Sequence, residues 1–380
     1  MRKLEVILKL AEVCNIACDY CYYFFSGDHR PARRPAYVRD DVIAGLVEFL
    51  NKGHREGAFD QVQVDLHGGE PLMIGGDAFD KLCHTLTTQV DAPLRLCITT
   101  NAMLIDERWI DRLARWQVHA CVSIDGPEEI HDRHRRDKRG RGTHARVMRG
   151  FQALMGAHHD GRISMPAVLC VVDPATDGAR IYDYLVHELG VRSLDFLLPD
   201  RTWDSRLPDE GSVALYMAAV MERWLTDDDP AIHLRTMRSV LSILAGGRTY
   251  LGGFGPQQAL AMTVGSDGTI DTDDFLKPCG ADVIATRRNI ADASFDDVFG
   301  DARIVEVAQA IATIPEACTP CLFRGACRGG QATHRFSRTH GFANRSIYCD
   351  AQFAMFRRGA QHLLRTGVPV ETVAKSCLAA

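Results

Sequence analysis

The chain has 380 residues, enough for two or three domains, and its composition is that of an ordinary globular protein: 46% apolar and 24% charged. A net charge of −5 does not favour polyanion binding, so we predict no nucleic-acid partner. No stretch approaches the ~20 apolar residues of a membrane helix, and the N-terminus lacks an apolar signal region. We therefore predict a cytoplasmic protein that does not bind membranes.

The first 200 residues alternate short apolar strands with helical patterns. We expect strands at 4–10, 62–66, 94–99, 119–124, 167–172 and 193–198, and helices at 41–52, 77–89, 107–115, 143–156 and 175–189. Asp40 and Asp106 are the expected caps of the first and third helices. Such alternation predicts a parallel sheet in an α/β fold, and six units predict a partial (β/α)6 barrel with its active site at the carboxyl ends of the strands.

Three cysteines follow the first predicted strand with the spacing C-x3-C-x2-C: Cys14, Cys18 and Cys21. Three thiolates can hold three irons of a [4Fe–4S] cluster and leave the fourth iron for a small molecule. A zinc knuckle or unrelated buried thiols are the alternatives. Thirteen clustered cysteines in a chain without an export signal favour metal or redox chemistry over disulfides.

Polar motifs also follow the next three predicted strands. Gly68, Gly69, Glu70 and Pro71 come after the second strand, where two glycines allow close backbone approach and a carboxylate can face an amino group. Asn101 comes after the third strand, and Ser123 and Asp125 lie at the end of the fourth. Hydroxyl and carboxylate groups there could bind a ribose, although ordinary turn chemistry explains the same residues.

The second half of the chain changes character. Two amphipathic helices are expected at 213–225 and 232–244, a hairpin around Asp267 and Gly268, and a helix near 349–364. We divide the chain into residues 1–210, a helical bridge at 211–260 and a smaller α+β domain at 261–380. That last segment carries a second cysteine set, Cys318, Cys321, Cys327 and Cys349, which suits a [4Fe–4S] cluster or a structural zinc.

The first cysteine set, with Tyr20 before its last member, resembles the signature of radical S-adenosylmethionine (SAM) enzymes. The resemblance implies a [4Fe–4S] cluster that binds SAM through its open iron, and it implies SAM contacts from Tyr20, Gly68, Gly69, Glu70, Pro71, Asn101, Ser123 and Asp125. Either Arg135 or Arg136 would reach the SAM carboxylate.

The C-terminal segment resembles the SPASM domain of peptide-modifying radical SAM enzymes, which implies an auxiliary cluster on the second cysteine set. Gln331 stands where that family often has a cysteine, and no cysteine precedes the Asp267–Gly268 hairpin. We therefore expect a single auxiliary [4Fe–4S] cluster. Cys279 is then a core thiol, a substrate-site residue or an unusual ligand.

By this resemblance the substrate is a ribosomally made precursor peptide, and the electron donor is of the flavodoxin or ferredoxin type. The motifs look most like the maturases that join an aromatic ring to a β-carbon, the cyclophane-forming group. Thioether formation, epimerisation and sulfatase-type formylglycine formation are the alternatives. Asp273 and Asp274 are acid–base candidates, unless they are ordinary loop carboxylates.

The chain starts directly at its first strand, so a leader-binding module is either absent or supplied by a separate partner. The non-enzymatic alternative is a zinc-stabilised binding scaffold whose cysteines are all structural.

Overall fold

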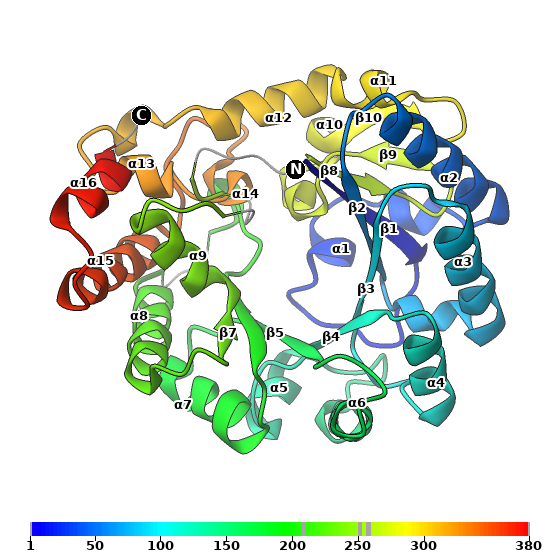
Figure 1. Cartoon of the computed structure of the whole chain (residues 1–380), viewed down its shortest axis with the longest axis horizontal. Coiled ribbons are helices and arrows are strands. Elements are labelled where there is room, and N and C mark those ends of the chain that lie inside the picture. Colours follow the sequence, from blue (N-terminus) through cyan, green and yellow to red (C-terminus); the bar gives the residue numbers. More distant parts are fainter. Residues whose placement is uncertain (1, 207–209, 250–252, 256–259, 379–380) are drawn as a thin grey trace. The chain divides into compact units, whose positions relative to one another are not determined.

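The computed structural model of the chain describes residues 2–206, 210–249, 253–255 and 260–378 (Figure 1). It contains two compact units, each of which draws on separate parts of the sequence. Unit 1 comprises Met1–Ile124, Glu128–Val168 and Leu260–Val305, and unit 2 comprises Asp125–Pro127, Leu169–Ala259 and Glu306–Ala380. The predicted segments 1–210, 211–260 and 261–380 follow changes in the sequence pattern, whereas the two units are defined by spatial compactness. The predicted division into three segments stays a prediction.

Four parallel strands in unit 1 lie where the sequence predicts them. They are β1 (Lys3–Ala11), β2 (Gln61–Gly68), β3 (Leu94–Thr100) and β4 (His119–Ser123), and they are hydrogen-bonded in that order. The register places Leu8 beside Leu66 and Lys9 beside His67. The mixed α/β class with parallel strands is thus confirmed, and a partial barrel stays a prediction.

The two faces of these strands differ in polarity. Leu4, Val6 and Leu8 on β1 are fully buried, because side chains alternate between the faces of a strand and this set makes the apolar side. Lys9 and His67 point to the opposite face, which is the polar one. That face is the one available for chemistry.

Helices connect the strands of unit 1: α1 (Tyr22–Phe25), α2 (Asp40–Arg55), α3 (Gly76–Gln89), α4 (Glu107–Arg115), α5 (Glu128–His134) and α6 (His144–His159). Figure 1 shows α2, α3 and α4 along one side of the strands and α1 on the other. Asp106 caps α4 by accepting a hydrogen bond from the Trp109 amide, as predicted. The predicted cap Asp40 is wrong: Asp40 is the first residue of α2, and Arg39 occupies the cap position without a side-chain bond.

The segment that contains the predicted hairpin joins the same sheet. β8 (Leu260–Val264) pairs parallel with the other edge of β1, and β9 (Thr269–Asp271) folds back antiparallel onto β8, with Gly268 in the turn. The chain then forms the 3-10 helix η5 (Asp274–Cys279), α10 (Ala281–Ile284), β10 (Ala285–Asn289) and α11 (Phe295–Phe299). This placement sets η5 near the carboxyl end of β1.

Unit 2 is mainly helical. β5 (Ala167–Val171) leads into it, and β6 (Ser193–Leu197) pairs with the short β7 (His233–Leu234). Its helices are α7 (Gly178–Asp183), α8 (Glu210–Asp227), α9 (Arg235–Leu244), α13 (Arg324–Cys327), α14 (Ala332–Arg335), α15 (Cys349–Arg365) and α16 (Val370–Leu378), and α12 (Ala302–Ala312) leads from unit 1 into unit 2. The predicted helix at 175–189 is a short α-helix followed by a π-helical turn at Tyr184–Glu188. Among the residues described, no helix combines the length and the apolar character needed to cross a bilayer.

Candidate active site

The first cysteine set lies on a loop that leaves the end of β1. Cys14 and Cys18 are buried, and Cys21 packs against the same cluster. The loop backbone is held in place, because the Ala17 amide donates to the Arg136 carbonyl at 2.7 Å and the Cys21 amide donates to the Cys18 carbonyl at 3.1 Å. The structure therefore brings the three predicted ligands together.

These thiols fit a metal cluster better than they fit a disulfide network. All thirteen cysteines of the chain are present as thiols. Burial raises the pKa of Cys14 to about 12, and burial also raises the pKa of Cys21. Thiolates are the metal-binding form, so iron would have to displace protons from both groups.

The glycine turn after β2 lies directly against the cysteine loop. The Gly69 amide donates to the Ala11 carbonyl at 2.7 Å, and the Glu70 amide donates to the Val13 carbonyl at 2.9 Å. A Cβ atom on Gly69 would lie 2.3 Å from the Val13 carbonyl oxygen, and Gly68 has φ of +142°. Glycine is needed at both positions because the two strand ends touch backbone to backbone.

Glu70 binds the protein with both carboxylate oxygens. One oxygen accepts from the Thr100 hydroxyl at 2.7 Å and from the Leu72 amide at 3.1 Å, and the other accepts from the Asn101 amide at 2.8 Å. Burial raises the pKa of Glu70, which these hydrogen bonds oppose. The carboxylate thus fixes the ends of β2 and β3 relative to each other, and its predicted contact with SAM stays a prediction.

Asn101 connects the third strand end to the cysteine loop. Its side-chain amide donates to Asn15 at 2.7 Å and lies 4.0 Å from the Cys14 sulfur. Of the predicted SAM-contacting residues, Gly68, Gly69, Glu70, Pro71 and Asn101 therefore gather at the loop that carries the cysteines.

Tyr20 and Arg135 form a second side of this loop. Arg135 is buried and donates a 2.7 Å hydrogen bond to the Tyr20 hydroxyl, whereas Arg136 donates to the Asp132 carbonyl on an exposed surface. The charge of Arg135 also acts on Cys21 and Glu70. Between the two predicted arginines, the geometry favours Arg135 as the group near the cysteine loop.

Ser123 and Asp125 fall on different units. Ser123 is the half-buried last residue of β4 in unit 1. Asp125 is buried in unit 2 and accepts a hydrogen bond from the Val171 amide at 3.1 Å. That bond gives Asp125 a structural role, and SAM binding by either residue stays a prediction.

The second cysteine set lines one cavity in unit 2. Cys318, Cys321, Cys327 and Cys349 all face a space of about 290 Å³, and the remaining wall includes Arg324, Arg345 and Gln352. Gly329 and Gly330 follow Cys327 with φ of +85° and +79°, so the chain turns sharply around the cavity. Four thiols around one space fit the predicted auxiliary cluster.

Zinc is the other metal that the sequence allows at these four cysteines. A Zn–S bond of about 2.3 Å requires four sulfurs about 3.7 Å apart around one ion. Among the described residues, no three His, Cys, Asp or Glu side chains are grouped closely enough to hold a single metal ion.

Cys279 does not belong to this cavity. It is fully buried at the end of η5 in unit 1, whereas the four cysteines of the cavity lie in unit 2. Its burial agrees with the predicted core thiol, and the role of Cys279 stays a prediction. Two further thiols of unit 1, Cys97 and Cys121, are half-buried.

Asp274 is tied to the cysteine loop through two side chains. Its Oδ2 accepts a 2.6 Å hydrogen bond from Lys9 on β1, and it also accepts from the hydroxyl of Tyr22, the residue after Cys21. Burial alone would raise the pKa of Asp274, but the charges of Lys9 and His67 and these hydrogen bonds lower it to about 2. Asp274 is therefore held as a carboxylate.

The neighbouring Asp273 is held in the opposite state. Burial, together with the charges of Glu5 and Asp274, raises its pKa to about 8. A carboxyl pair with pKa values pushed apart is a common arrangement in acid–base sites. The sequence identified both aspartates, but it gave no signal for the partners Lys9 and Tyr22.

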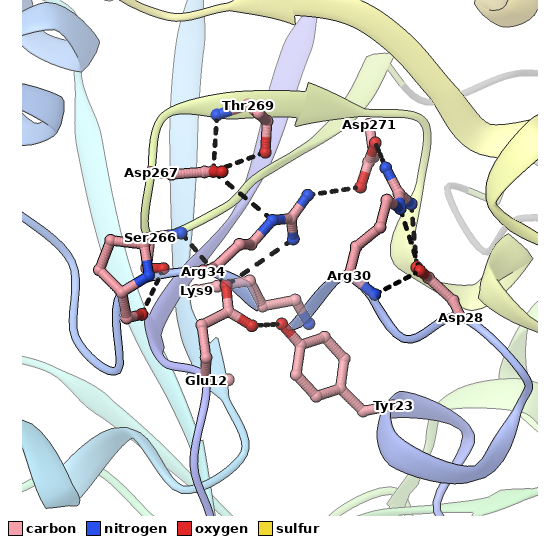
Figure 2. Close-up of polar contacts among 12 residues, drawn as sticks. Lys9, Glu12, Tyr23, Asp28, Arg30, Arg34, Ser266, Asp267, Thr269 and Asp271 are labelled. Carbon is pink, nitrogen blue, oxygen red and sulfur yellow. Dashed lines mark hydrogen bonds and ion pairs between the residues drawn. The ribbon is translucent and has the colours of Figure 1, made fainter. Parts of the chain in front are cut away.

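Figure 2 shows a network of charged side chains that includes Asp28, Arg30, Arg34 and Asp271. Arg30 and Arg34 reach Asp271 on β9 at 2.8 and 3.2 Å, and Asp28 accepts from Arg30 and from Lys277 at 2.9 Å. The ammonium groups of Lys9 and Lys277 each lie 4.4 Å from the centre of the Tyr23 ring. This network, which sequence reasoning missed, attaches the β8–β9 hairpin to residues 28–34, the segment that follows α1.

Comparison with known proteins agrees with this geometry. Residues 8–171 match the family model described as Radical SAM superfamily. The chain therefore contains a radical SAM domain and is a radical SAM enzyme, whose cofactors are a [4Fe–4S] cluster and SAM.

Particular relatives extend over nearly the whole chain. A cysteine-type anaerobic sulfatase-maturating enzyme of Clostridium perfringens (strain 13 / Type A) is 24% identical over 96% of this chain and 98% of its own. A serine-type enzyme of Bacteroides thetaiotaomicron is 23% identical over 95% of this chain and 91% of its own. The structure of native anSMEcpe with bound AdoMet and Cp18Cys peptide matches with a TM-score of 0.80 at 24% identity, over 96% and 98% of the two chains, which shows a shared fold.

Proposed function

We propose that this enzyme modifies a residue of a peptide or protein, and that it oxidises a cysteine or serine side chain to an aldehyde. The full-length relatives are sulfatase-maturating enzymes of the cysteine and serine types, which supports this alternative over the cyclophane reaction that the C-terminal resemblance predicts. The observation that carries the proposal is the attachment of Asp274 to Tyr22, directly after Cys21. A base thereby stands beside the loop where SAM would be cleaved.

The cysteines would hold the cofactors. Cys14, Cys18 and Cys21 would ligate the SAM-binding cluster, and the four cysteines of the unit 2 cavity would ligate one auxiliary cluster. When bound, these groups supply the radical that removes a hydrogen atom from the substrate and an acceptor for the electron that the product releases. An external flavodoxin- or ferredoxin-type protein would supply the initiating electron.

The protein side chains position SAM and move a proton. Gly68, Gly69, Glu70, Pro71 and Asn101 would shape the SAM site together with Tyr20 and Ser123, and Asp125 is a further predicted SAM contact. Forming an aldehyde also removes a proton from the substrate thiol or hydroxyl. We assign its acceptance to Oδ2 of Asp274, because a base must be ionised at the working pH, and Asp273 is protonated at neutral pH.

Crosslinking of an aromatic ring to a β-carbon is the second candidate. It is favoured by the sequence of residues 260–305, in which Cys279 is the single cysteine, so that this segment does not carry the ligand set of a second auxiliary cluster. A single-cluster maturase was the pattern predicted from the sequence. Both reactions begin with removal of a hydrogen atom, so the same residues would serve either one.

The test is mass spectrometry of two peptides after anaerobic reaction with reconstituted enzyme and SAM. The first probe is the Cp18Cys peptide, and the second is the product of a short reading frame next to the gene, obtained by co-expression. Aldehyde formation should create a hydrazide-reactive product. If the residue was cysteine, the first product is a thioaldehyde, to which water supplies the oxygen while hydrogen sulfide leaves. A crosslink should remove two hydrogens and give no hydrazide adduct.

Two variants separate the steps. Cys18→Ala should abolish 5′-deoxyadenosine formation, and Asp274→Asn should retain SAM cleavage but lose product. Unchanged peptide conversion by Asp274→Asn would remove the assigned base. If neither probe changes mass while SAM is cleaved, aldehyde formation on these substrates is refuted.

A further inference from the structure

Arg335, at the end of α14, is the largest of the fully buried side chains, with 1% of its surface exposed. Its guanidinium donates only to backbone carbonyls: to Phe342 at 3.0 Å, to Thr313 at 3.1 Å and, more weakly, to Arg328 at 3.5 Å. Among the described residues it makes no ion pair with a carboxylate. A buried guanidinium without a negative partner is costly, because arginine cannot shed its proton.

The position of Arg335 shows where its negative partner would be. A Cβ atom on Gly329 would lie 3.5 Å from Cδ of Arg335, and Gly329 itself lines the four-cysteine cavity. The side chain therefore packs directly behind the cavity wall. Burial lowers the pKa of Arg335 to about 10, and the negative groups that oppose this are Cys318 and Cys327.

The chemistry of the proposed auxiliary cluster explains the arrangement. Four thiolates outweigh the positive charge of a [4Fe–4S] core, so the bound cluster is an anion, and one-electron reduction makes it more negative. A fixed cation in a dry setting favours the more negative state. We propose that Arg335 is the buried countercharge of the four-cysteine site and that it raises the reduction potential of the cluster held there.

This role goes beyond the proposed reaction, since it applies whichever bond the enzyme makes. Arg324 and Arg345 also line the cavity, but they are more exposed and water screens their charge. Arg335 is therefore the most deeply buried of these three cations. It acts through the cluster and is not itself a catalytic residue.

The experiment uses the full chain with Cys14, Cys18 and Cys21 all changed to Ala, so that only the auxiliary cluster contributes a signal. In this background we compare Arg335, Arg335→Lys and Arg335→Met after anaerobic reconstitution. Arg357→Met is the matched control, because it removes one positive charge from the exposed side of α15. The readouts are iron and zinc per chain and an EPR-monitored redox titration.

We expect Arg335→Met to keep its cluster and to show, at the wild-type midpoint potential, a ratio of reduced to oxidised cluster at least about tenfold lower, which corresponds to a shift of about 59 mV to lower potential. Arg335→Lys should recover most of the shift, and Arg357→Met should show none. Iron loss from Arg335→Met, but not from Arg335→Lys, would also support a countercharge.

Three results would overturn the proposal. One is an unchanged potential in Arg335→Met with full iron content. Another is equal iron loss from Arg335→Lys and Arg335→Met. That result would mean that cluster retention depends on the three hydrogen bonds from Arg335 to backbone carbonyls and not on its charge. The third is zinc in place of iron in all forms. That result would refute the auxiliary cluster, but it would not affect the enzyme class, which rests on Cys14, Cys18 and Cys21.

Discussion

Lys9 and Asp274 form a buried ion pair between residues 265 positions apart in the sequence. Each would be costly to bury alone, and each makes the charge of the other tolerable. Asp274 was recognisable as a candidate from its loop. Lys9 could not be recognised as its partner, because it lies in an apolar strand and an isolated lysine in such a strand normally extends its ammonium group into solvent.

The effect of Lys9 on Asp274 can be tested by pH. Lys9→Met removes the nearest positive charge and leaves a buried carboxyl, so the pKa of Asp274 should rise from about 2 by about one to three units. Because only the carboxylate accepts a proton, the acidic limb of the peptide-modification rate should move to higher pH. The measurement is initial rate against pH with saturating peptide.

Lys3→Met is the matched control for that series. Lys3 lies on the same strand but bonds to Gln63 at 2.8 Å, away from Asp274. Its pH profile should follow the wild type. An acidic limb in Lys9→Met that coincides with the wild type would mean that Asp274 does not accept the proton.

Asp273 predicts a pH dependence of stability. Its pKa rises from an ordinary 3.8 to about 8 on folding, so the folded state binds the proton more tightly. The contribution of Asp273 to the free energy of unfolding is therefore fully present below about pH 4, where both states are protonated, and it is lost as the pH rises through about 8. Asp273→Asn should therefore gain at least about 1 kcal/mol relative to wild type between pH 5 and pH 9, measured by urea unfolding at each pH.

Asp292→Asn provides the reference for Asp273→Asn, because Asp292 is exposed on the surface of the same unit. The stability difference between Asp292→Asn and wild type should stay flat over this range. If the Asp273→Asn difference is equally flat, Asp273 is not held protonated in the folded protein.

At the level of elements, the ends of β1 and β2 do most to build the site. Their backbones touch through Gly69, which brings the glycine turn against the cysteine loop. The sequence predicted that both motifs lie at strand ends, and parallel pairing of adjacent strands then brings them together. The sequence did not show that β8 pairs with β1, because an apolar run of five residues fits any sheet edge.

Gly69→Ala tests the contact between these strand ends. The added methyl would meet the Val13 carbonyl oxygen at 2.3 Å, and backbone cannot move aside as a flexible side chain can. We expect a loss of about 1–3 kcal/mol of stability and weaker iron retention by the cysteine loop. Urea unfolding and iron analysis after gel filtration measure the two effects.

Gly156→Ala is the comparison for Gly69→Ala. Gly156 lies within α6, and a Cβ atom there would meet nothing within 4 Å. Alanine should stabilise the helix by about 0.5–1 kcal/mol without changing iron content. Equal behaviour of the two variants would show that the close approach at Gly69 has no role in the site.

For the whole molecule, the two cysteine sets predict the iron content. Two [4Fe–4S] clusters correspond to about eight irons per chain, and Cys318→Ala combined with Cys321→Ala should reduce this to about half. The same reduction should follow loss of Cys14 and Cys18, but with SAM cleavage abolished only in the second case. Anaerobic iron and sulfide analysis provides the count.

Cys279→Ala serves as the control in that series. Cys279 is buried in unit 1 and does not line the four-cysteine cavity, so its loss should leave the iron content at the wild-type value. A decrease would assign Cys279 as a ligand. Zinc without visible absorbance in every form would instead favour the structural-scaffold alternative.

The sequence by itself determined the class of enzyme and the chemical groups of the site. Cysteine spacing, the glycine turn and the alternation of strands with helices are local patterns, set by residues close together in the chain. The strands β1 to β4 and both cysteine sets were therefore predictable, as was the position of Asp274.

The tertiary structure alone decided the electrostatic partners and the division into units. Lys9 beside Asp274, Arg335 behind the cysteine cavity and β8 beside β1 all join segments distant in sequence. Which residues meet there depends on how whole elements pack and on which buried charges must be neutralised. These long-range contacts cannot be predicted from residues that are close together in the sequence.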